Sequence, residues 1–169
     1  MTAGSGPAPG PGPDEEALTP ERVLAQEERA TLSRFDNDDA VDLGLIAVRL
    51  GRGRSLPIVV EVRGLEQVLF RAALPGSSVA NDSWISRKAA LVEALGHSSV
   101  YYRLLHEAAG QSFTEYTGLP EQDYAAHGGG VPILVRDVGR VGVMVVSGLP
   151  QLDDHALVVE CLQALQERS

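Results

Sequence analysis

Two pairs of short apolar runs, each pair joined by a tight turn, constrain the fold of this 169-residue chain more than any other feature. The first pair runs from Pro57 to Val62 and from Gln67 to Ala72, on either side of Arg63-Gly64-Leu65-Glu66. The second pair runs from Val131 to Val135 and from Val141 to Ser147. Short β-rich runs separated by turn residues are typical of β-hairpins. We therefore expect four strands in two antiparallel pairs.

Segments with helical patterns surround these hairpins. A first helix is expected from Thr19-Pro20 to about Ser33, because a capping hydroxyl precedes a proline suited to the first helical position. A second is expected from Asn37 or Asp38 to Gly51-Arg52-Gly53, with Val41, Leu45 and Val48 as its apolar stripe; a strand through residues 43–46 is the alternative. A third helix is expected from the capping residues Asn81, Asp82 and Ser83 to Gly96, which stops it. Further helices are expected from Ser98 or Ser99 to about Ala109 and from about residue 153 onward.

The order of these elements predicts an α/β domain of the α+β kind, in which helices cover a small antiparallel sheet. Between Gly110 and Ala126 the sequence is irregular and polar, with Pro120, Tyr116 and Tyr124. Functional residues concentrate on such connecting segments. The stretch is therefore predicted to be a loop over a site.

The N-terminal residues differ from the rest in composition. Eight of the first thirteen are Gly or Pro, which neither propagate a helix nor bury apolar area. We expect residues 1–18 to be a disordered tail and residues 19–169 to form a single domain. The start of the chain has neither the basic residues nor the apolar stretch of a secretory signal, so a cytoplasmic location is expected.

Charge and cysteine content limit the partners. With 23 acidic and 14 basic residues the net charge is -9, which disfavours binding to nucleic acid, and no apolar run is long enough to span a membrane. The single cysteine, Cys161, cannot form an internal disulfide. It lies among leucines and is interpreted as a buried packing thiol.

Three consecutive glycines precede the third strand in His127-Gly128-Gly129-Gly130. Glycines let backbone N–H groups approach a ligand closely and can form an anion-binding concavity. The alternative is a tight turn into the strand that begins before Pro132. An esterase is not indicated, because Gly96-His97-Ser98-Ser99 lacks the second glycine of a nucleophile elbow.

Other polar residues each have a structural interpretation beside a functional one. The four histidines, His97, His106, His127 and His155, stand too far apart for a metal motif and are interpreted singly as surface or capping residues. Asp153 and Asp154 suit the start of the last helix. Trp84 fits the core or an oligomer interface. Arg87 and Lys88 beside it could receive a carboxylate, although an exposed helical face is the commoner explanation.

Several segments together resemble the heme-degrading domain superfamily, over residues 20–166 in order and spacing. They are Phe35-Asp36-Asn37-Asp38-Asp39-Ala40, Ala73-Leu74-Pro75-Gly76, Asn81-Asp82-Ser83-Trp84 with Arg87-Lys88, Gly96-His97-Ser98-Ser99, Tyr124-Ala125-Ala126-His127-Gly128-Gly129, and Ser147-Gly148-Leu149-Pro150 with Asp153-Asp154-His155. The chain most resembles the branch of small uncharacterised cytoplasmic proteins. The strand around Pro132 and the Val-Ser-Gly turn are also similar to GlcG and to secreted heme-binding proteins.

The resemblance implies an α-β-α layered domain of profilin-like appearance that forms homo-oligomers. It also implies heme binding, with heme degradation left open and no catalytic residue assigned; a small anionic ligand is the other option. His127 is the candidate ligand to heme iron. The other candidate ligand-binding residues are Trp84, Arg87, Lys88, Tyr101, Tyr124, Gly128, Gly129, Gly130, Pro132, Ser147, Gly148 and His155. The alternative function is a non-enzymatic homo-oligomeric protein-interaction module.

Overall fold

The computed structural model describes residues 17–168, so almost all of the tail expected at residues 1–18 lies outside the described residues. The helices and strands within this range are α1 (Pro20–Arg29), α2 (Asn37–Gly53), β1 (Val59–Arg63), β2 (Val68–Ala73), α3 (Val79–Leu95), α4 (Ser99–Ala108), α5 (Phe113–Thr117), β3 (Gly130–Val135), β4 (Gly139–Ser147) and α6 (Gln151–Gln166). Both hairpins are confirmed. The short helix α5 was not expected, and it lies inside the stretch predicted to be a loop.

All four strands form one antiparallel sheet in the order β2-β1-β4-β3. The two hairpins join through β1 and β4, where Val60 pairs with Val146 and Val62 pairs with Met144. The outer edge of β3 is covered by Leu32, whose N–H donates to Leu134 O at 2.8 Å. Strand β2 is therefore the open edge of the sheet within the described part of the chain.

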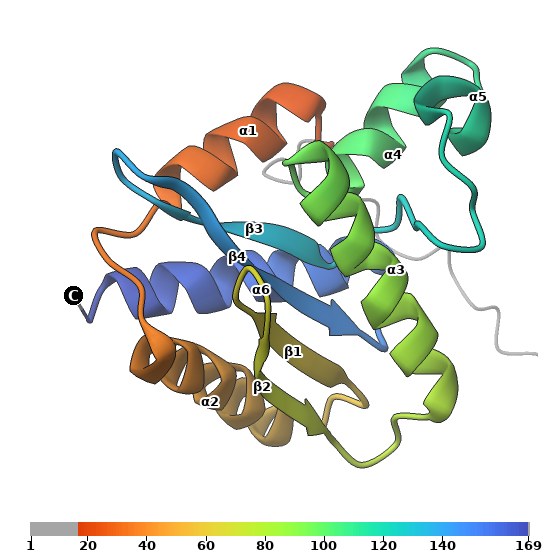
Figure 1. The fold of residues 1–169 in the computed structure, drawn as a ribbon. Coiled ribbons are helices and arrows are strands. Elements are labelled where there is room, and N and C mark those ends of the chain that lie inside the picture. Colours follow the sequence, from red (N-terminus) through yellow and green to blue (C-terminus); the bar gives the residue numbers. More distant parts are fainter. Residues whose placement is uncertain (1–16, 169) are drawn as a thin grey trace, which may run out of the picture.

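Helices cover both faces of this sheet, as Figure 1 shows. Successive side chains of a strand point to opposite faces, so Val60 and Met144 pack toward α2 and α6. Val59 and Val145 point the other way and pack against Ile85 of α3. The α-β-α layered fold predicted from the sequence is confirmed.

Helix α2 is present over the expected residues, but its apolar stripe was assigned wrongly. Val41 and Leu45 are 41% and 48% exposed, whereas Leu43, on the opposite side of the helix, is buried in the core. The reason is Gly44: a Cβ there would lie 2.1 Å from Phe70 Cδ1. The absent side chain lets Phe70 of β2 pack on the helix backbone, and this contact sets the rotation of the helix.

The helix ends were partly foreseen. Thr19 caps α1 by accepting a hydrogen bond from Arg22 N at 3.2 Å, as expected, although this helix ends at Arg29 rather than near Ser33. Helix α3 begins at Val79, before the predicted caps, and ends at Gly96 as predicted. Helix α6 begins at Gln151, two residues early.

Cys161 is fully buried among the residues that join α6 to α2. Burial raises the pKa of its thiol to about 12, so the thiol is unreactive at neutral pH. The interpretation as a packing residue is confirmed. Between residues 17 and 168, the helices are all too short or too polar to cross a lipid bilayer.

Candidate functional site

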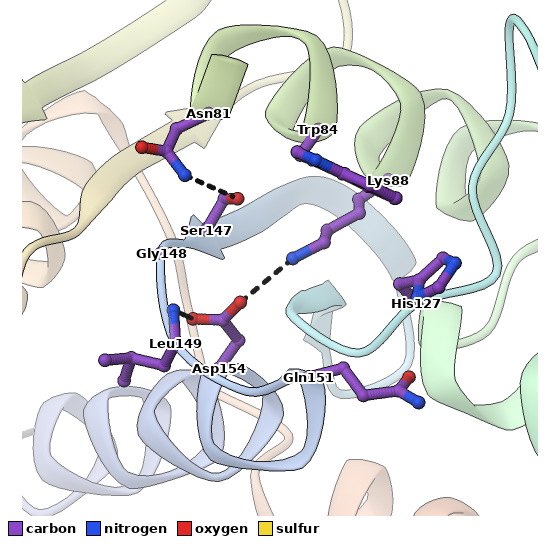
Figure 2. A pocket seen from close by; sticks show the side chains of 9 residues that line it. All are labelled: Asn81, Trp84, Lys88, His127, Ser147, Gly148, Leu149, Gln151 and Asp154. Atoms are coloured by element: carbon purple, nitrogen blue, oxygen red, sulfur yellow. Dashed lines mark hydrogen bonds and ion pairs between the residues drawn. The ribbon is translucent and has the colours of Figure 1, made fainter. Parts of the chain in front are cut away.

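Polar side chains gather at the end of the sheet where β4 finishes and β3 begins. Helix α3 approaches this end from one side and the first turn of α6 from the other (Figure 2). Between them lies a cavity of about 270 Å³. We call it the first cavity, and it is lined by Asn81, Trp84, Lys88, His127, Ser147, Gly148, Leu149, Gln151 and Asp154.

The three glycines let these elements approach one another. Gly129 has a φ of +128°, and a Cβ there would lie 2.3 Å from Val146 O. The amides around it already have partners: Gly128 N donates to Gln151 Oε1 at 3.0 Å, and Gly130 N donates to Ser99 Oγ at 3.0 Å. The structure therefore favours the tight turn over an anion-binding concavity for these two amides.

A buried ion pair crosses the first cavity from α3 to α6. Lys88 Nζ donates to Asp154 Oδ2 at 3.1 Å and to Val146 O at 3.1 Å (Figure 2). The two charged side chains are only 3% and 2% exposed. Burial lowers the pKa of Lys88 and raises the pKa of Asp154, and the attraction between the two charges opposes both changes. Lys88 is thus not on an exposed helical face, and the commoner explanation from sequence is wrong for this residue.

Trp84 and His127 form an aromatic wall beside this pair. Their rings meet edge to face, with centroids 4.8 Å apart, and both side chains are half-buried. In the described part of the chain, no hydrogen bond reaches either ring nitrogen of His127. Burial, helped by the nearby cations Arg103, Lys88 and Arg87, lowers the pKa of His127. The imidazole is therefore neutral at physiological pH, with a nitrogen available to a ligand.

A second cavity, of about 240 Å³, lies on the other side of this wall. It is lined by Trp84, Arg87, Arg103, His106, Phe113, Glu121, Tyr124, Ala125, Ala126 and His127. Arg87 stacks over Trp84 at 4.7 Å and its Nε donates to Glu121 O at 2.9 Å. The segment predicted to be a loop over a site thus supplies one side of this second cavity, although part of it is helix α5.

The structure brings together most, but not all, of the candidate residues. Ser147 and Gly148 line the first cavity with Lys88, and Tyr124 lines the second with Arg87. Six candidates line neither cavity. Gly128, Gly129 and Gly130 are buried in the turn that leads into β3. Tyr101 packs between His97 and Tyr102, Pro132 is buried within β3, and His155 is buried in the core.

His155 is 2% exposed, so its interpretation as a surface or capping residue is wrong. Its Nε2 lies 2.7 Å from Gln26 Oε1, and its Nδ1 has no hydrogen-bond partner within the described residues. Burial lowers the pKa of His155 to about 4. The side chain is a neutral core residue at physiological pH.

Sequence reasoning missed several lining residues. Asn81 and Asp154 were interpreted only as helix caps, and Arg103 and Gln151 were not singled out. A cap signal was the only one available, because the partners of these residues come from distant elements. Within residues 17–168 no group of three or more histidines, cysteines and carboxylates could hold a metal ion.

Comparison with known proteins identifies the family. The family model described as "Haem degrading protein HbpS-like" matches residues 35–163. A UPF0303 protein of Streptomyces avermitilis is 49% identical over 144 residues, which are 85% of this chain and 88% of that protein. A UPF0303 protein of Azotobacter vinelandii is 41% identical over 147 residues, covering 87% and 89% of the two chains.

Solved structures agree with the fold. The crystal structure of Ybr137w is 30% identical, with a TM-score of 0.84 over 90% of each chain. The crystal structure of a PduOC:heme complex is 17% identical, with a TM-score of 0.65 over 78% of this chain and 94% of that one, and at this identity the likeness shows the fold alone. By the match over residues 35–163, this chain belongs to the HbpS-like family of heme-degrading proteins.

Proposed function

We propose that this chain binds heme beside the Trp84–His127 wall, with His127 as the ligand to the iron. The observation that carries the proposal is the half-buried, neutral imidazole of His127, to which no described residue donates or accepts a hydrogen bond. Heme iron in proteins is commonly held by a neutral histidine nitrogen. Family membership supports the same ligand.

The surroundings of His127 fit other parts of a heme. Trp84 offers an aromatic edge, and the guanidinium groups of Arg87 and Arg103 lie on the second-cavity side of the wall. Arginine suits carboxylates such as heme propionates because its planar fork donates two parallel hydrogen bonds. The iron would supply any redox chemistry, while these residues would bind and orient the macrocycle.

The cavities limit how heme can sit. They measure about 270 and 240 Å³, below the roughly 300 Å³ at which pockets begin to enclose drug-sized ligands. Neither cavity alone could enclose a macrocycle. Heme would therefore remain partly exposed to solvent, an arrangement that favours a reversible carrier or sensor over a deeply held prosthetic group.

Heme titration with matched histidine variants tests the proposal. The wild-type protein should give a saturable Soret band at one heme per protomer, and His127→Ala should weaken binding or change the spectrum. His106→Ala is the matched control, because His106 lines the second cavity but its Nδ1 is 3.0 Å from Gln111 O. An unchanged affinity and spectrum in folded His127→Ala protein would remove this residue as the ligand.

A second function is favoured by a separate surface, on which the chain would assemble with copies of itself. Strand β2 is the open edge of the sheet, and Val68 on it is 48% exposed. Val41 and Leu45 form an exposed apolar stripe on α2, the helix on which β2 packs through Phe70. Open edges are usually covered by pairing or assembly. Light scattering that shows only a 17.9 kDa monomer at micromolar concentration would contradict this.

A further inference from the structure

Lys88 is the only lysine in the chain, and the other thirteen basic residues are arginines. Arginine is the usual choice for a buried ion pair, because its rigid fork matches a carboxylate and its charge is always retained. This chain instead places its one primary amine side chain in the buried pair with Asp154. A role in stability alone does not explain why this position holds lysine rather than arginine. A role as a nucleophilic amine does explain it.

The amine also faces a cavity. Lys88 lines the first cavity together with Asn81 and Ser147, and Figure 2 shows its side chain reaching from α3 toward Asp154. Its nitrogen has two acceptors within the described residues, Val146 O and Asp154 Oδ2, which leaves one position unused. Ser147 is 4% exposed, and among the residues that the structure describes its hydroxyl only accepts a 3.4 Å contact from Asn81 Nδ2, so its proton is available to a ligand.

The charge balance of the cavity selects the ligand class. Asp154 already balances Lys88, and His127 is neutral, so no unpaired cation lines the first cavity as described. A ligand carboxylate would compete with Asp154 for one ammonium group and is disfavoured. An uncharged ligand with a carbonyl and a hydroxyl group would instead match the amine and the hydrogen-bonding groups of Asn81 and Ser147.

We propose that the first cavity binds a small uncharged hydroxy-aldehyde or hydroxy-ketone, and that Lys88 Nζ forms a Schiff base with its carbonyl carbon. This step does not depend on heme. The ammonium first passes a proton to the Asp154 carboxylate, and the free amine then attacks the carbonyl carbon to form a C–N bond. The carbonyl oxygen leaves as water, taking one proton from the amine and one from Asp154. The product is a protonated imine paired with the Asp154 carboxylate, so no other reactant is needed.

The electrostatics of the pair support this chemistry. Burial lowers the pKa of Lys88 and raises the pKa of Asp154, and both changes favour the neutral amine and acid. Desolvation in this way is a common means of activating a lysine nucleophile. The same cavity is about 270 Å³, which suits a molecule of a few carbon atoms.

Reductive trapping on the full-length protein tests the proposal. The folded protein is treated with glycolaldehyde and sodium cyanoborohydride at neutral pH, and peptide mass mapping quantifies the adduct at Lys88. We expect labelling about tenfold faster than that of Nα-acetyl-lysine amide in the same solution, because burial increases the fraction of free amine. Lys88→Arg protein, which retains only the N-terminal amine, gives the background.

Two comparisons make the result decisive. Acetaldehyde lacks the hydroxyl group, so it should label wild-type Lys88 more slowly than glycolaldehyde, and Ser147→Ala should reduce that difference. The proposal is overturned if Lys88 is labelled only after the protein is unfolded in urea, or no faster than the model amine. Either result would make the lysine a structural partner of Asp154 alone.

Discussion

The two faces of the sheet bury different chemistry. The face under α2 and α6 is apolar, with Val60, Val62, Met144 and Val146 packed against leucines of the two helices. The face under α3 has a smaller apolar cluster and also buries the carboxylate of Glu61, 2% exposed. At the end of the sheet where β4 finishes, this face continues into the first cavity.

The apolar face mainly stabilises the fold, whereas the α3 face also carries the candidate functional site. Apolar burial stabilises the fold at roughly 25 cal/mol per Å², whereas each buried charge costs free energy unless it is paired. On the α3 face, Glu61 accepts hydrogen bonds from Arg63 at 2.6 Å and from Arg71 at 2.8 Å. Lys88 is likewise paired, but it lines a cavity. A costly group that faces a cavity is the better candidate for function.

The largest effect should come from breaking the buried pair. Lys88→Met leaves the Asp154 carboxylate buried without its partner, so the free energy of unfolding should fall by about 3–5 kcal/mol in urea titrations. The double variant with Asp154→Leu should recover much of this loss. Arg54→Met, which breaks the exposed Arg54–Glu160 pair, should have a much smaller effect. If Lys88→Met and Arg54→Met lowered the free energy of unfolding equally, the buried pair would be no more important to stability than the exposed one.

A smaller effect should appear with pH on the apolar side, where His155 is buried. Its folded pKa of about 4 lies below the ordinary value of 6.5, so the unfolded chain binds the proton more readily between these values. Stability from this residue is therefore complete above pH 6.5 and is lost as pH falls toward 4, by about 3 kcal/mol.

His155→Leu isolates this contribution. Urea unfolding at pH 7 and at pH 4.5 should show a shallower pH dependence in this variant than in the wild type. His106→Leu, at a partly exposed position, should retain the wild-type slope. If His155→Leu and the wild type lose stability in parallel, the buried imidazole is not the source of the acid sensitivity.

The smallest effect on stability is expected at the exposed stripe of α2. Leu45→Ser should change the free energy of unfolding by less than about 0.5 kcal/mol, because the side chain is 48% exposed. Leu43→Ala, in the core two residues away, should cost about 2–5 kcal/mol. If the stripe is an assembly surface, Leu45→Ser should instead lower the mass measured by light scattering.

The sequence predicted the elements better than their rotations. The hairpins followed from β-rich runs and turn residues, and the end of α3 followed from Gly96. The orientation of α2 did not follow, because it depends on Phe70 filling the space over Gly44, a contact between distant residues. Helix α5 was missed because five residues give no clear period.

The sequence likewise predicted part of the site. Trp84 and His127 were both singled out, and the structure places their rings in contact. The role of Lys88 was not foreseen, since its burial depends on Asp154, 66 positions further along the chain. His155 was included among the candidate residues because of the family resemblance, but its side chain is buried in the core.

Hydrogen exchange with and without heme tests most directly whether the ligand binds at the polar end of the α3 face. On addition of one heme per protomer, exchange should slow in residues 124–130 and in the central turns of α3, which carry His127, Trp84 and Arg87. Exchange in α2, on the opposite face, should be unchanged. Slower exchange in α2 and β2 without any change in residues 124–130 would contradict the account.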